Sequence, residues 1–212
     1  MSGLRTDPAG LAAIVIGGDG EPWRSIGFAG SRTIAFANGS IVLDTDAPAG
    51  IHGFSIHGDA RRLGDRLVVD GVECGVVDHE PVEVADHPNG AFELDHVVLT
   101  TDSLERTCTA VDDVLGMPLK RVRDLGVARQ GFHRFADEPW ARGCIVEVVE
   151  SPEHRDPGVA TPWGLVVNLR DLERVAGAGH VGEARSAVQP GRRIATVSRS
   201  AGLGTALALM SH

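Results

Sequence analysis

A strand that runs directly into the start of a helix occurs twice in this chain. Residues 96–105 match residues 164–173 in length and in their pattern of apolar and polar positions. The first helix is expected to begin at Thr101 or Asp102 and to end at Gly116, and the second to cover 170–176. Strands are expected after these helices over 119–123, 129–135, 144–149, 184–188, 193–198 and 206–210. One βαβββ unit therefore follows another, and units of this kind need a neighbour to complete a core.

The N-terminal part of the chain carries a weaker copy of the same pattern. Residues 11–19 resemble the first opening and residues 49–63 the second, and both of the helices that follow would be short. Strands are expected here over 11–17, 33–37, 40–43, 51–56, 66–69 and 72–77. We therefore predict an α+β protein with an abbreviated domain over 1–80, a Pro-containing linker over 81–92 and a domain of two βαβββ modules over 93–212.

The charge of the chain is uneven. Its 212 residues have a formal net charge of −9. Residues 1–93 contain 6 Lys and Arg against 14 Asp and Glu, whereas residues 94–212 contain 14 against 15. Nucleic acids and anionic membranes need a basic face, so we expect neither as a partner. A neutral or cationic small ligand is easier to accommodate.

The cysteines and the N-terminus indicate a compartment. Cys74, Cys108 and Cys144 lie far apart without C-x-x-C spacing, which is typical of buried thiols in a reducing environment. The first residues show no basic segment followed by an apolar one, and the longest uncharged apolar stretch, near 9–18, is too short to span a bilayer. These observations predict a cytoplasmic protein.

Three segments of the second half carry a family resemblance. The run LDHVVLTTD over 94–102, followed by a helix ending in Val114-Leu115-Gly116, resembles the vicinal oxygen chelate superfamily of glyoxalases, bleomycin-resistance proteins and extradiol dioxygenases. Residues 143–150 resemble the fourth strand of that superfamily, and residues 188–197 resemble a segment of its glyoxalase-like members. The resemblance implies paired βαβββ modules that form curved mixed sheets around a cup, with helices outside and commonly a divalent metal in the cup.

The resemblance also implies where metal ligands would lie. They come from the first and fourth strands of each module, which match His96 and Glu147 in the first module. The positions of the second module match Gly164 and residues 206–209, which offer no acid or imidazole. This incomplete set would hold zinc, manganese, nickel or iron weakly, and His133 is a candidate third ligand.

His96 and Glu147 leave three interpretations open. They are metal ligands, or a metal-free pair in which Glu147 moves a proton next to a carbonyl, or a structural pair, since an unpaired glutamate is costly to bury. His133 and Phe135 share one face of their strand and are candidates, with Trp163, for substrate binding. Core packing is the alternative for those aromatic residues.

The expected function is a glyoxalase-like small-molecule enzyme of lyase, isomerase or dioxygenase type. It would act on an oxygenated metabolite in the cup of the C-terminal domain, with Glu147 and His96 as catalytic residues. The alternative is a metal-free protein that binds a small molecule or drug, as bleomycin-resistance relatives do, usually as a homodimer. A third alternative is a structural or regulatory protein with a filled cup. Arg192 and Arg193 are expected in a solvated turn, with the binding of a substrate carboxylate as the alternative.

Overall fold

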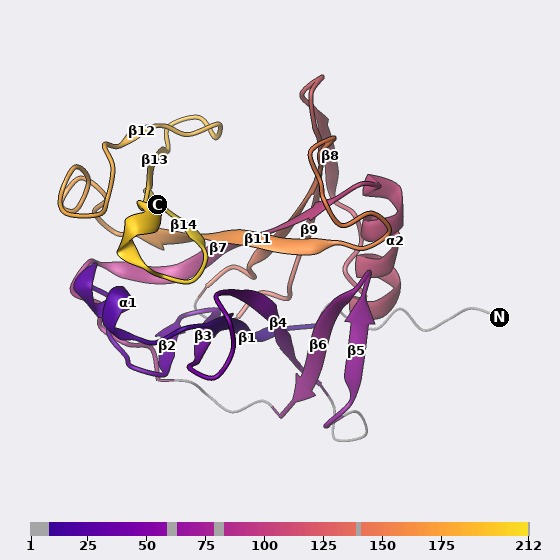
Figure 1. Ribbon diagram of the computed structural model, residues 1–212, viewed down its shortest axis with the longest axis horizontal. Coiled ribbons are helices and arrows are strands. Elements are labelled where there is room, and N and C mark those ends of the chain that lie inside the picture. The colour runs from indigo at the N-terminus through magenta and orange to yellow at the C-terminus, as the bar shows by residue number, and fades with distance from the viewer. Residues whose placement is uncertain (1–8, 59–62, 79–82, 139–140, 212) are drawn as a thin grey trace.

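The computed structural model describes residues 9–58, 63–78, 83–138 and 141–211, which form two mixed β-sheets (Figure 1). The N-terminal half forms a sheet of six strands in the order β2-β3-β1-β4-β6-β5, and the C-terminal half forms one of eight in the order β12-β13-β14-β11-β7-β10-β9-β8. The elements of the N-terminal half are β1 (Leu11–Gly17), α1 (Glu21–Ser25), β2 (Thr33–Phe36), β3 (Gly39–Asp44), β4 (Gly50–His57), β5 (Arg66–Val69) and β6 (Val72–Val77). Those of the C-terminal half are β7 (Ala91–Thr101), α2 (Leu104–Leu115), β8 (Arg121–Asp124), β9 (Arg129–Arg134), β10 (Ile145–Glu150), β11 (Thr161–Leu169), β12 (Arg185–Ser186), β13 (Arg193–Thr196), a 3₁₀ turn (Arg199–Ala201) and β14 (Ala206–Ser211).

The eight-stranded sheet consists of two modules with one arrangement. In each module the opening strand pairs in parallel with the last strand, β7 with β10 and β11 with β14, and a hairpin continues outward. The opening strands β7 and β11 pair antiparallel at the centre, so both modules belong to one chain. The sheet bends, with β8 and β9 rising at one side and β12 and β13 at the other (Figure 1). The predicted pairing of modules in a curved mixed sheet is confirmed.

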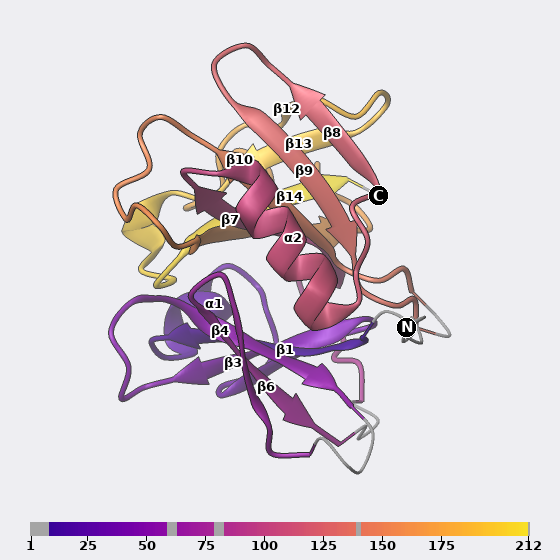
Figure 2. The same cartoon turned by 90° about the vertical axis from the view of Figure 1, so that its right-hand side faces the viewer.

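Helix α2 covers the convex side of this sheet, against β9 and β10 (Figure 2). It begins at Ser103, whose hydroxyl accepts a hydrogen bond from the Arg106 backbone NH, and it ends at Gly116 with φ of 66°. Leu104, Cys108 and Val111 form its buried stripe, at the spacing that an amphipathic helix requires. The predicted end is confirmed, and the start lies one residue after Asp102.

The second module has no α-helix where the sequence predicts one. Residues 170–176 form turns in which Leu172 is the buried anchor. The apolar pattern there covers only seven residues, and Gly177 and Gly179 follow with φ of 74° and 57°. A segment this short cannot offset the cost of helix nucleation, so the predicted helix is wrong.

The six-stranded sheet repeats this arrangement with fewer strands. Its opening strands β1 and β4 pair antiparallel at the centre, and each pairs in parallel with its last strand, β3 or β6. Each of these units has one hairpin strand fewer than its C-terminal counterpart. The β5–β6 turn uses Asp70 and Gly71 at φ of 48° and 92°, the conformation that the sequence predicts for this dipeptide.

The described part of the predicted linker is packed rather than loose. His87 and Asn89 are buried. Nδ1 of His87 accepts from the Ala29 backbone NH at 2.9 Å, and its Nε2 donates to the Ala35 carbonyl at 3.0 Å. Asn89 donates to the Ile26 carbonyl at 3.0 Å. Residues 79–82 lie outside the described part, and residues 91–92 already belong to β7. The segment 83–90 is therefore held against the N-terminal half by hydrogen bonds.

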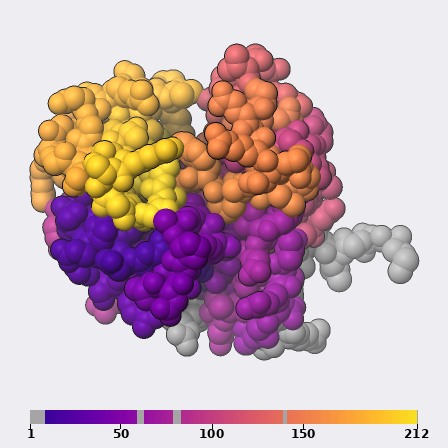
Figure 3. Space-filling view, viewed as in Figure 1, coloured from indigo at the N-terminus to yellow at the C-terminus, as the bar shows by residue number. Residues whose placement is uncertain are grey.

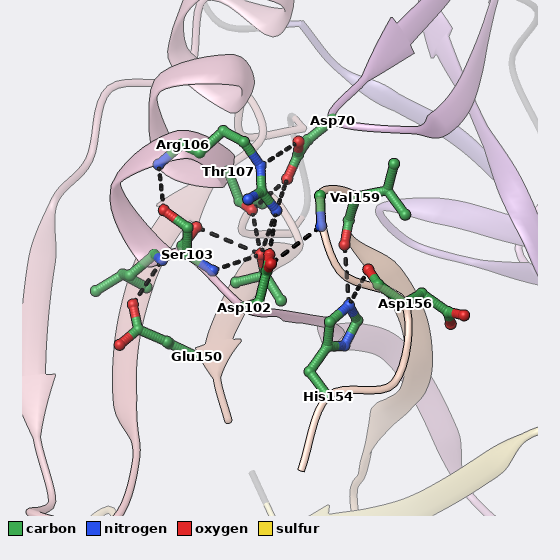
Figure 4. A network of polar contacts seen from close by, with 12 residues as sticks. Asp70, Asp102, Ser103, Arg106, Thr107, Glu150, His154, Asp156 and Val159 are labelled. Atoms are coloured by element: carbon green, nitrogen blue, oxygen red, sulfur yellow. Dashed lines mark hydrogen bonds and ion pairs between the residues drawn. The ribbon is translucent and has the colours of Figure 1, made fainter. Parts of the chain in front are cut away.

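A polar network joins the two halves (Figure 4). Asp70, in the β5–β6 turn, accepts from Arg106 Nε at 2.8 Å and from Arg106 Nη2 at 3.2 Å. The hydroxyl of Thr107 also donates to Asp70, and Arg106 forms a second ion pair with Asp102 at 2.7 Å. The turn of the first sheet is therefore fastened to the first turn of α2.

Two sequence expectations concern the chain as a whole. The three cysteines are free and buried, as predicted. In the described ranges, no helix is long and apolar enough to cross a membrane.

Candidate active site

An irregularity in β7 places Asp95 and His96 on the same face of the sheet. Val166 of β11 pairs with His96, but the next residue of β11 pairs with Leu94, so Asp95 is the extra residue of a β-bulge. Leu94 and Val97 are both buried on the convex side. The two residues between them therefore both face the concave side.

Asp95 binds the imidazole of His96 through the ring nitrogen that points away from Glu147. Its Oδ2 lies 2.7 Å from His96 Nδ1, and its Oδ1 accepts from Arg192 Nη1 at 2.8 Å and from Asn168 Nδ2 at 3.0 Å. Burial opposes the charge of Asp95, but the hydrogen bonds and charges of His96 and Arg192 outweigh it and lower the pKa of this carboxyl. An ionised carboxylate only accepts hydrogen bonds, so we assign a proton to Nδ1 of His96.

Glu147 faces the other nitrogen of the same imidazole. In the parallel pairing of β7 and β10, Ile145 is opposite His96 and Glu147 is opposite Val98, which makes His96 and Glu147 diagonal neighbours. Oε2 of Glu147 lies 3.4 Å from His96 Nε2, and its Oε1 accepts from Gln130 Nε2 at 2.6 Å. Burial raises the pKa of Glu147 above its ordinary value. With a proton on Nδ1, Nε2 is the nitrogen of His96 that faces the Glu147 carboxyl group.

Two adjoining cavities lie on the concave face above this pair, with volumes of about 490 Å³ and about 380 Å³. The residues that line both are His96, Gln130, Glu147, Arg185 and Ile194. Figure 3 shows the molecule hollowed between its yellow to light-orange C-terminal part and the red to orange part opposite. These volumes fall within the range of sites for small molecules.

The structure brings three of the predicted site residues to this hollow. His96 and Glu147 are in contact at its floor. Trp163 lines the larger cavity with 56% of its surface exposed. His133 and Phe135 are corrected: both are buried outside the hollow, and Nδ1 of His133 donates to the Met117 carbonyl at 2.7 Å. His133 is therefore neither a substrate contact nor a third metal ligand here, because strand alternation turns it toward the convex side.

Gln130 and Phe132 occupy the face of β9 that the sequence analysis assigned to His133. Glu147 pairs with Phe132 across β9 and β10, so Phe132 and Gln130 share its face. Both residues line the smaller cavity. The register of this strand pair was the missing signal, because alternation alone does not say which face points inward.

Comparison with known proteins gives the fold. No protein-family model matches the chain, and no curated protein matches it. A triple mutant of 4-hydroxymandelate synthase from Streptomyces coelicolor is similar in structure, with a TM-score of 0.60 at 12% identity over 97% of this chain and 93% of that chain. This chain has the vicinal oxygen chelate fold.

Two epimerases match a shorter part of the chain. Methylmalonyl-CoA epimerase from Streptomyces coelicolor is 16% identical over 56% of this chain and 95% of its own, with a TM-score of 0.43. The Mycobacterium tuberculosis enzyme is 17% identical over 58% of this chain and 89% of its own, with a TM-score of 0.44. The function must be argued from the site itself.

The vicinal oxygen chelate fold here supplies few donors for a metal. His96 Nε2 and Glu147 Oε2 are the donors at the cup floor. Gly164 and residues 206–209 add no donor side chain, and the described residues contain no group of three His, Cys, Asp or Glu placed to hold a metal ion. Two donors leave most of the coordination shell of zinc, manganese, nickel or iron to water. The residues therefore do not fit the metal site that the resemblance implies.

Proposed function

We propose that the protein is a small-molecule enzyme that moves a proton at a carbon atom next to a carbonyl group. The observation that carries this proposal is the contact of 3.4 Å between His96 Nε2 and Glu147 Oε2 at the floor of an open cavity. A protein with a purely structural His–Glu pair would have no need of a hollow above it. The open hollow therefore favours chemistry over the alternative of a filled cup.

The geometry supplies a base and an acid. In the ion-pair form of the two side chains, the Glu147 carboxylate takes the proton from the carbon atom. The electron pair of that C–H bond forms the C=C bond of an enolate, and the carbonyl π electrons move onto oxygen. His96 donates its Nε2 proton toward that oxygen, and Asp95 stabilises the positive imidazolium from behind. Protonation of the same carbon on its opposite face gives an epimer. In an α-hydroxy ketone, protonation of the former carbonyl carbon of the enediol, with loss of the proton of the hydroxyl group, gives an isomer.

The surroundings of Glu147 suit a base. Burial raises its pKa, which makes the carboxylate a stronger base than an exposed glutamate. Val98, Val149 and Val166 form apolar walls in the larger cavity, and such walls reduce the access of water. Gln130 donates a hydrogen bond to Oε1 of Glu147, so that Oε2 is the oxygen that faces His96 and the cavity.

Solvent-deuterium exchange tests the proposal. The protein is incubated in D₂O with a panel of enolisable 2-oxo acids, 3-oxo acids and ketones, and loss of the C–H signal is followed by NMR. We expect exchange with at least one compound, and a loss of at least about 100-fold in Glu147→Gln, as is usual when a general base is removed. Glu21→Gln, at the exposed end of α1, is the matched control and should keep the wild-type rate. Equal rates in wild type and Glu147→Gln would overturn the assignment.

A binding protein is the second candidate, because much of the lining of the larger cavity is apolar. Leu165, Leu207 and Ala208, on β11 and β14, line it together with the His–Glu pair. If the protein captures a small molecule without turnover, the panel should show saturable binding by NMR line broadening and no exchange. Exchange at a rate that depends on Glu147 would exclude capture alone.

A further inference from the structure

We propose that the ligand of this cup carries a carboxylate, held between Arg123 and Arg185 from opposite rims. This inference names the substrate class of the proposed enzyme and rests on the proposed function to that extent. The anion site itself is argued from the charges and shape of the cavity.

The two arginines come from opposite edges of the curved sheet. Arg123 lies on β8 and Arg185 on β12, the outermost strands of the eight-stranded sheet. Both nevertheless line the same cavity of about 380 Å³, together with His96 and Glu147. The bend of the sheet brings these edges to face each other across the hollow (Figure 1). Two cations far apart in the sheet order therefore converge on the reacting groups.

Neighbouring arginines are neutralised by carboxylates. Arg192 pairs with Asp95 at 2.8 Å, and Arg193 pairs with Glu173 at 2.6 Å. From the sequence, these two are alternative binders of a substrate carboxylate, but in the structure both are already paired with carboxylates of the protein. Arg129 pairs likewise with two glutamates, Glu105 and Glu150.

Arg123 and Arg185 differ from these. Among the residues that the structure describes, no carboxylate forms an ion pair with either side chain. The guanidinium of Arg123 lies over the ring of Phe132, 5.8 Å from its centroid, which gives it a defined place at the rim. The cavity therefore has a surplus of positive charge beside Glu147.

A carboxylate on the ligand would complement this excess of positive charge. A guanidinium presents paired N–H donors that match the two oxygens of a carboxylate. A carboxylate substrate must also approach Glu147, and like charges repel strongly at short range in a partly dry cavity. Arg123 and Arg185 would offset that repulsion. The net charge of −9 favoured a neutral or cationic ligand, but the cavity lining reverses that expectation locally.

Binding of malonate tests the inference without any turnover. Isothermal titration of the full chain with malonate should give a saturable Kd in the millimolar range or tighter, and added salt should weaken it. Arg123→Gln and Arg185→Gln should each weaken binding roughly tenfold, and the double variant should abolish it. Arg193→Gln removes an equal charge on β13 that is already paired with Glu173, so it should keep the wild-type Kd. Dimethyl malonate, the neutral analogue, should not bind.

The outcomes separate this inference from the proposed function. Glu147→Gln should keep or tighten malonate binding while it loses proton exchange. Malonate binding that depends on both arginines, without exchange of any compound, would support the anion site and reject the enzyme. No malonate binding up to about 50 mM, equal binding of the diester, or an unchanged Kd in the double variant would overturn the anion site.

Discussion

Four side chains at the floor of the cup act as one unit. Asp95 fixes the tautomer of His96 and directs its Nε2 toward Glu147. Gln130 holds the other oxygen of Glu147. Each residue therefore has a distinct effect on proton transfer, and substitutions should separate positioning from chemistry.

The pH profile should report the environment of Glu147. Exchange requires its carboxylate, so kcat/KM should rise with pH through the raised pKa of Glu147, above the usual glutamate value of about 4.3. Gln130→Leu removes a hydrogen bond to the charged form, which raises this pKa further and moves the acid limb to higher pH. The measurement is kcat/KM between pH 4 and 8 for both proteins. An acid limb at the same pH in Gln130→Leu would contradict the role of Gln130.

Asp95→Asn should cost stability in a pH-dependent way. The substitution leaves Arg192 and His96 without their buried carboxylate, a loss of about 3 kcal/mol at pH 7. The pKa of Asp95 is lowered in the folded protein, so its contribution is present above the unfolded value of about 3.9 and is lost as pH falls toward the folded value. Urea unfolding at pH 7 and pH 3 should show a difference between the two proteins that shrinks in acid. Asp113→Asn, at an exposed position of α2, should show no such difference.

At the scale of elements, the segment 83–90 holds the first sheet through a neutral histidine. Nδ1 of His87 accepts a hydrogen bond, so protonation would break its contact with the Ala29 backbone NH. Burial lowers the pKa of His87, and it does the same for His133 under α2. Two elements are therefore sensitive to acid through histidines outside the cup.

His87→Gln should flatten the pH dependence of stability. A lowered pKa in the folded state means that the unfolded chain binds more protons, so the free energy of unfolding falls as pH drops below about 6.5. One such group contributes at most about 1.4 kcal/mol per pH unit. Unfolding curves at pH 7, 6 and 5 should show a smaller slope in His87→Gln. The exposed His52→Gln should retain the wild-type slope, and a wild-type slope in His87→Gln would refute the account.

The bounds of strands could be predicted from the sequence where local turn residues determine them. The strands at 11–17, 66–69 and 72–77 have the predicted bounds, because turn residues fix their ends. The bulge at Asp95 and the inward face of β9 depend on how strands pair, and one chain read alone does not contain that information. His96 and Glu147 were found by resemblance, whereas Gln130, Arg123 and Arg185 reach the site only through the sheet's register and bend.

At the scale of the whole molecule, the two sheets share one hydrophobic core. The network around Asp70 adds a polar fastening between the β5–β6 turn and α2. Since α2 covers the convex side of β9 and β10, the first sheet supports the strands that carry Gln130 and Glu147. The N-terminal half therefore supports the cup from its convex side.

Asp70→Asn should loosen this fastening without straining the turn. Asn tolerates the positive φ of this position, so the substitution removes mainly the buried charge that pairs with Arg106. We expect a loss of about 2 kcal/mol in the free energy of unfolding and faster hydrogen exchange at the start of α2. Asp46→Asn, in the exposed turn after β3 of the same sheet, should change neither. Unchanged exchange in Asp70→Asn would show that apolar packing alone joins the halves.

The most direct test is the rate of C–H exchange in D₂O after treatment with a chelator, compared between wild type and Glu147→Gln. We expect the wild-type rate to survive chelation, to gain nothing from added zinc or manganese, and to be lost in Glu147→Gln. A wild-type rate that disappears on chelation and returns with metal would contradict the account. So would a Glu147→Gln protein that exchanges as fast as wild type.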